Sequence, residues 1–175
     1  MNNLIEDLLS YSRVNTQEHI LEPMSPEDTL FVVSHNLSKK IQETHTTIEI
    51  KNLPKEIIAN KTKLNQLFQN LIANAIKFRK KDVNAKVIVS GSEDERNWMF
   101  SVADNGIGIK DEFFEKIFGL FKKLHSKSDY QGSGIGLAVC KRIIEQHGGK
   151  IWVESEYEVG TTFHFTIPKQ CLMKN

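Results

Sequence analysis

The 175-residue sequence has little cysteine and proline and no long apolar run. Its two cysteines, Cys140 and Cys171, stand far apart, which fits a reduced, cytoplasmic setting better than a disulfide framework. No apolar run approaches the roughly 18 residues that a membrane-spanning helix needs, and the N-terminus lacks the pattern of a signal peptide. We therefore expect a soluble cytoplasmic chain, although a longer parent protein could be anchored in a membrane.

The sequence also lacks an excess of charge of either sign. Its formal net charge is +1, so no general basic field exists that would attract nucleic acid. We expect no nucleic-acid partner, and any phosphate binding must be local. The length is sufficient for one good hydrophobic core, so one principal domain is expected.

Hydrophobic spacing divides the chain into four parts. Residues 1–14 carry apolar side chains at helical spacing, and 15–25 form a polar linker that ends at a helix-capping serine. The main domain is expected over 26–168, and 169–175 is a tail. The first helix has too few turns to be stable alone and begins directly at Met1, so we expect a longer parent protein and a second helix for it to pack on.

Helical and strand patterns alternate within the main domain. Helices are expected at 26–44, 61–80 and 135–147, and strands at 47–51, 86–90, 98–103, 150–155 and 161–167. Because most of the strands are adjacent in sequence, this order predicts an α+β, two-layer sandwich with a mostly antiparallel sheet and its helices on one face. A parallel Rossmann arrangement fits less well.

The long helix carries the first candidate site. Asn70, Asn74 and Lys77 follow one another at helical spacing and share a stripe beside the apolar face. For an arbitrary helix, a solvated polar face is the commoner explanation. An amide oxygen is nevertheless a suitable ligand for Mg²⁺ bound to nucleotide phosphates, and the lysine can neutralise the negative charge of a phosphate.

Two glycine-rich segments provide further candidate contacts to a nucleotide. Asp104 follows an apolar strand and opens DNGIGI, where its carboxylate could accept a hydrogen bond from an adenine amino group; a simple turn is the alternative. The segment 132–137, GSGIGL, opens a helix whose free N–H groups can face an anion. No strand precedes this second segment and it lacks the Gly-Lys-Ser/Thr ending, so it matches neither the Rossmann fingerprint nor the P-loop.

Five segments in this order resemble those of the Bergerat-fold ATPases and, within them, the sensor histidine kinases. NLIANAIKF resembles the N box, DNGIGI the first glycine box, FEKIFGLFKKL the F box, GSGIGLAVCKRIIEQHGG the second glycine box and GTTFHFTIP the closing strand. The resemblance covers about 23–168. It implies a mixed sheet in an α/β sandwich.

The resemblance implies ATP and Mg²⁺ as cofactors and gives roles to single residues. Asn74 would hold Mg²⁺, and Asn70 and Lys77 would contact phosphates. Asp104 would bind the adenine amino group with the help of a water and Thr162. The mobile lid would span 110–131, with Lys123 reaching the γ-phosphate where the family often has arginine. The remaining nucleotide contacts would come from Phe78, Gly106, Gly108, Ile109, Gly132, Gly134, Gly136 and Leu137.

One position separates two reactions. Hydrolytic members of the superfamily carry a glutamate where this chain has Asn70, and an amide cannot act as a general base. The resemblance therefore implies a protein-histidine kinase with Asn70, Lys77 and Lys123 as catalytic residues. Its phosphohistidine would later pass the phosphoryl group to an aspartate of a response regulator. An ATP-binding sensing module and a slow ATPase remain the alternatives.

The acceptor histidine is expected outside this chain. LIEDLLSYSR resembles the end of the second helix of a dimerisation and histidine-transfer domain, whereas His35 lies downstream of it, where no acceptor belongs. We expect the acceptor on the preceding helix and a homodimeric parent joined through a four-helix bundle. The other histidines lack metal-ligand spacing.

Overall fold

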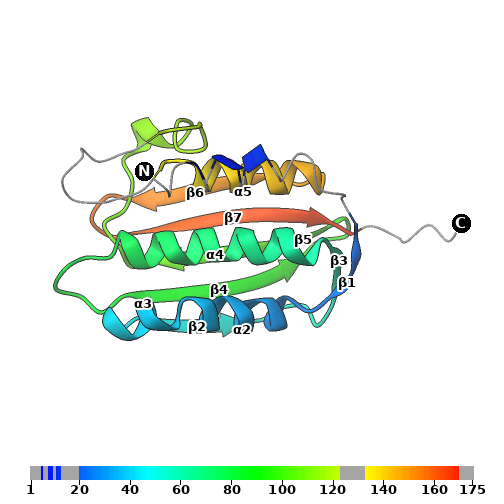
Figure 1. Cartoon of the computed structure of the whole chain (residues 1–175), viewed down its shortest axis with the longest axis horizontal. Coiled ribbons are helices and arrows are strands. Elements are labelled where there is room, and N and C mark those ends of the chain that lie inside the picture. Colours follow the sequence, from blue (N-terminus) through cyan, green and yellow to red (C-terminus); the bar gives the residue numbers. More distant parts are fainter. Residues whose placement is uncertain (1–4, 6–7, 10, 13–19, 123–132, 170–175) are drawn as a thin grey trace, which may run out of the picture.

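The computed structural model describes residues 5, 8–9, 11–12, 20–122 and 133–169. Its main sheet has the order β2-β4-β5-β7-β6 (Figure 1), and only the β2–β4 pair is parallel. The strands are β2 (Thr47–Lys51), β4 (Lys86–Glu93), β5 (Asn97–Asp104), β6 (Ile151–Glu156) and β7 (Gly160–Pro168). The expected mixed, mostly antiparallel sheet is confirmed.

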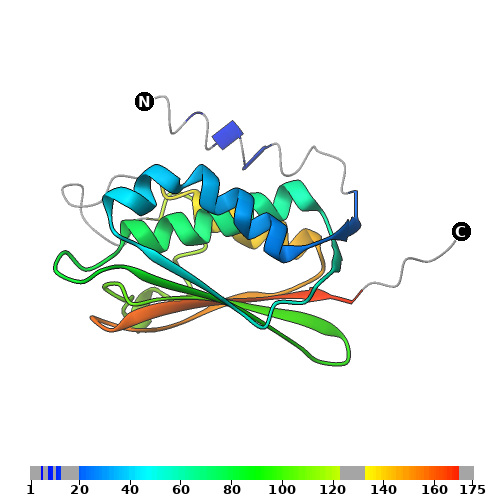
Figure 2. The same cartoon turned by 90° about the horizontal axis from the view of Figure 1, so that it is seen from below.

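The helices lie on one face of this sheet, as Figure 2 shows. They are α2 (Pro26–Asn36), α3 (Ser38–Glu43), α4 (Lys61–Lys77) and α5 (Gly136–Gln146). The two-layer α/β sandwich is therefore also confirmed. Along β5 and β7 alternate side chains face the helices, which is the pattern of a sheet with one covered face.

Aromatic side chains join the two layers. Phe68 of α4 meets Phe100 of β5 and Phe165 of β7 edge to face, with ring centroids 6.0 and 5.5 Å apart. Phe100 and Phe165 stack on each other at 5.1 Å. All three side chains are buried, and such pairs contribute about 0.5–1.5 kcal/mol each beyond the burial of their area. This cluster fixes α4 on the sheet.

Several expected boundaries were wrong. The helix expected over 26–44 breaks at the buried Leu37 (φ −96°, ψ 5°), so that α2 and α3 are separate. Helix α4 ends at Lys77 rather than at residue 80, because Phe78 leaves the helix where it meets the loop after β5. Strands β4 and β5 extend further towards each other than expected. Backbone pairing across the hairpin lengthens them beyond their apolar residues.

A second, two-stranded sheet was not expected. Strand β1 (Glu22–Met24) lies within the segment expected to be a linker and pairs antiparallel with β3 (Ile57–Ala59). Asn60 caps α4 and also joins two distant parts of the chain: its Nδ2 donates to the Ile20 carbonyl (3.0 Å) and its backbone N–H to His147 Nε2 (3.0 Å). The chain entering the domain is therefore hydrogen-bonded to the start of α4.

Within residues 1–14 only a few positions are described, and these are helical. Ile5, Leu8 and Leu9 are exposed, while Tyr11 packs against the core. Within the part of the chain that the structure describes, no helix is long and apolar enough to cross a membrane.

Candidate functional site

Helix α4 holds the three polar side chains singled out by the sequence. Its apolar face is buried against the sheet, and Asn70, Asn74 and Lys77 lie partly buried beside it. The Lys77 ammonium lies over the Phe78 ring, 4.7 Å from its centroid. The Phe78 carbonyl accepts from the Ile107 backbone N–H (3.0 Å). The end of α4 is thus tied to the first glycine segment.

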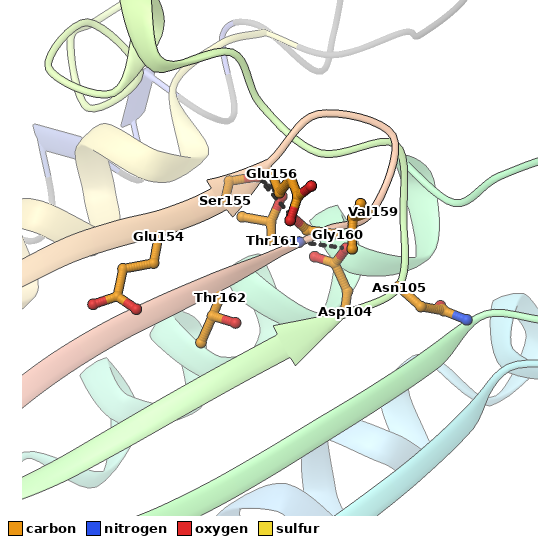
Figure 3. Close-up of a pocket in the computed structure, with 9 residues that line it drawn as sticks. All are labelled: Asp104, Asn105, Glu154, Ser155, Glu156, Val159, Gly160, Thr161 and Thr162. Atoms are coloured by element: carbon orange, nitrogen blue, oxygen red, sulfur yellow. Dashed lines mark hydrogen bonds between the residues drawn. The ribbon is translucent and has the colours of Figure 1, made fainter.

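Asp104 ends strand β5 with a largely buried carboxyl group. Its Oδ1 accepts from the backbone N–H groups of Gly106 (2.8 Å) and Thr161 (3.3 Å), and Figure 3 draws the bond from Thr161. Burial raises the pKa of Asp104 to about 6, although the two N–H donors act in the opposite direction. At neutral pH the group is therefore mostly a carboxylate, and it can still accept a hydrogen bond from a ligand.

The threonine beside Asp104 is Thr161, not Thr162. Thr161 pairs with Asp104 across the β5–β7 ladder and its side chain is buried, whereas Thr162 is the partner of Ala103 and Glu154. Successive residues of a strand point to opposite faces, so Thr162 lies on the other face of the sheet. The expected assistance from Thr162 is not supported by this geometry. The alternation of buried residues in β7 was the signal that favours Thr161.

The glycines after Asp104 are required by backbone packing. A Cβ atom on Gly106 would lie 2.5 Å from the Phe78 carbonyl oxygen. Gly108 has φ +71°, and a Cβ there would lie 2.1 Å from the Glu156 carbonyl oxygen. Ile109 follows with its N–H donating to Ser155 Oγ (2.8 Å). The loop is thus fixed between the end of α4 and the β6–β7 hairpin.

Helix α5 begins opposite Asn70. Gly136 is its first residue, and its carbonyl accepts from Asn70 Nδ2 at 3.3 Å. No side chain of the described residues caps this helix, so its first N–H groups remain available to an anion. Gly134 has φ +74° and lies against the backbone of the segment ending at Lys122, while Leu137 packs against the core.

A hollow of about 570 Å³ opens beside Asp104 (Figure 3). It is lined by Asp104, Asn105, Glu154, Ser155, Glu156, Val159, Gly160, Thr161 and Thr162. Asn70, Asn74 and Lys77 do not line it. Of the residues expected to contact the nucleotide, Asp104 and Thr162 line this hollow.

Part of the expected site lies outside the described residues. Lys123, Gly132 and the second half of the expected lid belong to 123–132. In the first half, a 3-10 turn covers Asp111–Phe113, and Phe118 packs edge to face on Phe163 at 6.2 Å. The described residues hold no cluster of three or more acidic, histidine or cysteine side chains suited to a metal ion.

Comparison with known proteins identifies the family. Residues 59–170 match the model of the histidine kinase-, DNA gyrase B- and HSP90-like ATPases. Cyanobacterial phytochrome A of Nostoc sp. strain PCC 7120 is 47% identical over 168 residues, which cover 96% of this chain and 22% of that protein. The chain thus spans about a fifth of the length of this curated relative.

Solved structures agree with this match. The catalytic domain of histidine kinase ThkA is 30% identical with a TM-score of 0.73, and the match covers 85% of this chain and 95% of that domain. ThkA in complex with response regulator TrrA matches at 27% identity and a TM-score of 0.75, covering 97% and 47% of the two chains. Full-length ShkA in complex with AMPPNP is 28% identical with a TM-score of 0.80, covering 96% and 36%. The chain therefore belongs to the histidine kinase-, DNA gyrase B- and HSP90-like ATPases, and within them to the ATP-binding catalytic domains of sensor histidine kinases.

Proposed function

We propose that this domain binds ATP with Mg²⁺ and donates the γ-phosphoryl group to a histidine of a dimerisation domain outside this chain. In the transfer, an imidazole nitrogen forms a bond to the γ-phosphorus while the bond from that phosphorus to the bridging oxygen breaks, and ADP leaves. Positioning and charge neutralisation supply most of the catalysis in such transfers. The dimerisation domain, the homodimeric parent and the bound metal are parts of this proposal.

The polar stripe of α4 fits a nucleotide–metal complex. Among the described residues no hydrogen bond engages the Asn74 side chain, so its amide oxygen is available to a hard cation. Lys77 lies one turn further on and can neutralise phosphate charge. A bound Mg²⁺ would supply charge stabilisation at the phosphates.

The adenine end is assigned to Asp104. Its carboxylate accepts two backbone N–H groups on one oxygen, Oδ1, and the other oxygen can accept from an adenine amino group. We assign the supporting role to Thr161 in place of Thr162, because of these two threonines it is Thr161 whose backbone N–H donates to Asp104. Gly106, Gly108 and Ile109 belong to the loop after Asp104, and Phe78 accepts a hydrogen bond from Ile107 of that loop.

The observation that carries the kinase assignment is the amide of Asn70. It lies opposite the open first turn of α5, where a hydrolytic enzyme would need a base to activate water. An amide has no proton-accepting role of that kind at neutral pH, so water attack gains no assistance from this side chain. The γ-phosphoryl group is thereby preserved for a histidine nucleophile.

Onward transfer to a response regulator is the proposed next step. ThkA has been solved with the response regulator TrrA, and this chain resembles ThkA over nearly its whole length. We therefore propose a receiver domain, carrying an acceptor aspartate, as the second protein partner.

The test is phosphoryl transfer in trans. The chain is mixed with γ-labelled ATP, Mg²⁺ and the dimerisation domain of its parent protein, and acid-labile, base-stable label on that domain is measured. We expect label on the wild-type acceptor and none on an acceptor whose histidine is replaced by glutamine. Tight ATP binding without label would instead identify a sensing module, and rapid release of phosphate would identify an ATPase.

A further inference from the structure

Helices α4 and α5 lie side by side (Figures 1 and 2) and meet at Asn70. Asn70 Nδ2 lies 3.3 Å from the Gly136 carbonyl oxygen. A carbonyl oxygen can only accept, so the nitrogen end of the amide must face it. This contact fixes the orientation of the Asn70 amide. Its nitrogen faces α5, and its oxygen, Oδ1, is the end that takes no part in this hydrogen bond.

Cys140 lies one helical turn after Gly136 and is fully buried. Its Sγ is 3.9 Å from the carbonyl oxygen of Leu67, one turn before Asn70 on α4. The thiol also interacts with the Asn70 side chain, which favours the thiolate as an N–H donor to sulfur does. Cys140 therefore contacts α4 at Asn70 and at Leu67, one turn before it.

The Cys140 thiol is not suited to act as a nucleophile. Burial raises the pKa of Cys140 to about 12, so the group remains a neutral S–H at physiological pH. A neutral thiol can donate weakly through S–H and accept weakly at sulfur. Its two neighbours on α4, a carbonyl oxygen and an amide N–H, match these two capacities.

We propose that Cys140 is a positioning residue for Asn70: together with the Gly136 carbonyl it holds the amide nitrogen on α5, so that Asn70 presents its oxygen to the nucleotide. This inference rests on the proposed kinase function. It changes the role expected for Asn70, because an amide oxygen can accept from an N–H group or a metal-bound water but repels a phosphate oxygen.

The orientation matters because an asparagine amide has two chemically different ends and a soft terminal torsion. If the sulfur of Cys140 is removed, one of the two protons of the Asn70 amide loses its hydrogen-bond acceptor. The Asn70 side chain can then rotate away from Gly136. In part of the molecules the nitrogen of the Asn70 amide, rather than its oxygen, would then face the transition state. Preorganisation of this kind affects transfer more than ground-state binding.

The test compares Cys140→Ala, which removes the sulfur, with Cys140→Ser, which retains a donor and an acceptor. In the trans-phosphorylation assay we expect Cys140→Ala to lower kcat about fivefold with less than about a twofold change in KM for ATP, and serine to restore most of the rate. Val139→Ala is the control for a cavity in the same helix, and it should lower thermal stability without lowering kcat.

A second readout does not depend on activity. The Asn70 side-chain amide protons are followed by NMR in the nucleotide-free chain. We expect their resonances to shift and exchange faster with water in Cys140→Ala, and to remain near the wild-type positions in Val139→Ala and Cys140→Ser. These results would support the positioning role.

The outcomes separate the two proposals. Unchanged Asn70 amide resonances and an unchanged kcat in Cys140→Ala would overturn the positioning role while leaving the kinase function intact. A wild-type chain that labels no histidine would overturn the kinase function, and the NMR comparison would still decide whether Cys140 holds Asn70. Equal losses of kcat in Cys140→Ala and Val139→Ala would show a structural effect alone and would also overturn it.

Discussion

At the scale of single residues, Asp104 has the most consequential environment. Its carboxyl group is largely buried, and its pKa of about 6 lies above the ordinary value of 3.8. A raised pKa in the folded state means that the protonated group favours folding. This contribution is fully present below about pH 3.8 and is lost as pH rises through about 6. At neutral pH the carboxylate therefore costs stability, and the proposed role of Asp104 in binding a ligand accounts for that cost.

Asp104→Asn should stabilise the folded domain at neutral pH. The amide oxygen can still accept from Gly106 and Thr161, and the desolvated charge is removed. We expect a gain on the order of 2 kcal/mol in the free energy of unfolding near pH 7.5, shrinking towards pH 5. Denaturant unfolding at both pH values measures it. A gain that did not depend on pH would contradict this account.

The affinity for ADP should also depend on the titration of Asp104. Here the deprotonated form is the favourable one, whereas the protonated form favours folding. A carboxylate accepts the adenine amino group better than a carboxylic acid does, so ADP binding should weaken as pH falls below about 6. Calorimetry on the wild type should show up to about a tenfold rise in Kd per pH unit there. Asp104→Asn, which cannot titrate, should bind ADP more weakly at neutral pH and lose this steep dependence.

Asn74 should contribute only when magnesium is present. Asn74→Ala removes the amide oxygen that we assign to the metal, so the increase in ADP affinity on adding Mg²⁺ should shrink about three- to tenfold. Binding measured in EDTA should hardly change. Gln69→Ala provides the matched control, because this exposed side chain on the same helix bonds only to Asn36 among the described residues. An equal loss in EDTA would remove Asn74 from the metal site.

At the scale of secondary-structure elements, the site depends on how the loop after β5 is held. The loop contacts the end of α4 through the Phe78 carbonyl and the β6–β7 hairpin through Ile109 and Ser155. The Glu158 backbone N–H also donates to the Ile107 carbonyl (2.7 Å). The hairpin therefore supports the proposed adenine end of the site although it is distant in sequence.

Gly108→Ala should disrupt this support. Its positive φ is unfavourable for alanine, and the new Cβ would overlap the Glu156 carbonyl oxygen. We expect a loss of about 2 kcal/mol or more in unfolding free energy together with weaker ADP binding. The control is Gly136→Ala, whose Cβ would meet its nearest atoms at 3.7 Å, and which should cost little stability. Equal losses of unfolding free energy in the two variants would refute the packing argument.

At the scale of the whole molecule, the two-stranded sheet determines where the N-terminal segment is attached. Strand β1 pairs with β3, and Met24 is buried in the main core. Asn60 links this pair to Ile20 and to His147 at the end of α5. The chain from residue 20 to Met24 is thus hydrogen-bonded to and packed on the α/β sandwich.

This attachment predicts the pattern of amide hydrogen exchange. Peptides covering 20–25 should be protected nearly as strongly as those covering 57–60, since both strands open together. Asn60→Ala removes the helix cap and the bond to Ile20, and should accelerate exchange at 20–25 by about tenfold, equivalent to the 1–2 kcal/mol that a cap contributes. Exchange at the unprotected rate in the wild type would contradict the pairing.

The sequence by itself determined the class of fold, the elements that carry the proposed site and the family. The apolar stripe of α4 and the alternation of β7 are local patterns with fixed periods, so they can be read without knowing what they pack against. The asparagine at position 70, where hydrolytic members of the superfamily carry glutamate, could also be recognised from the sequence. It concerns the type of residue rather than its place in the fold. These features led to a histidine kinase domain rather than a hydrolase.

Tertiary structure alone decided the contacts between segments distant in sequence. Strands of three residues such as β1 and β3 carry no periodic signal, because each is stabilised by the other and by the buried Met24. The choice of Thr161 over Thr162 follows from the register of β7 on β5. The orientation of the Asn70 amide follows from where α5 begins. In each case the deciding partner lies far along the chain, and only folding brings it into contact.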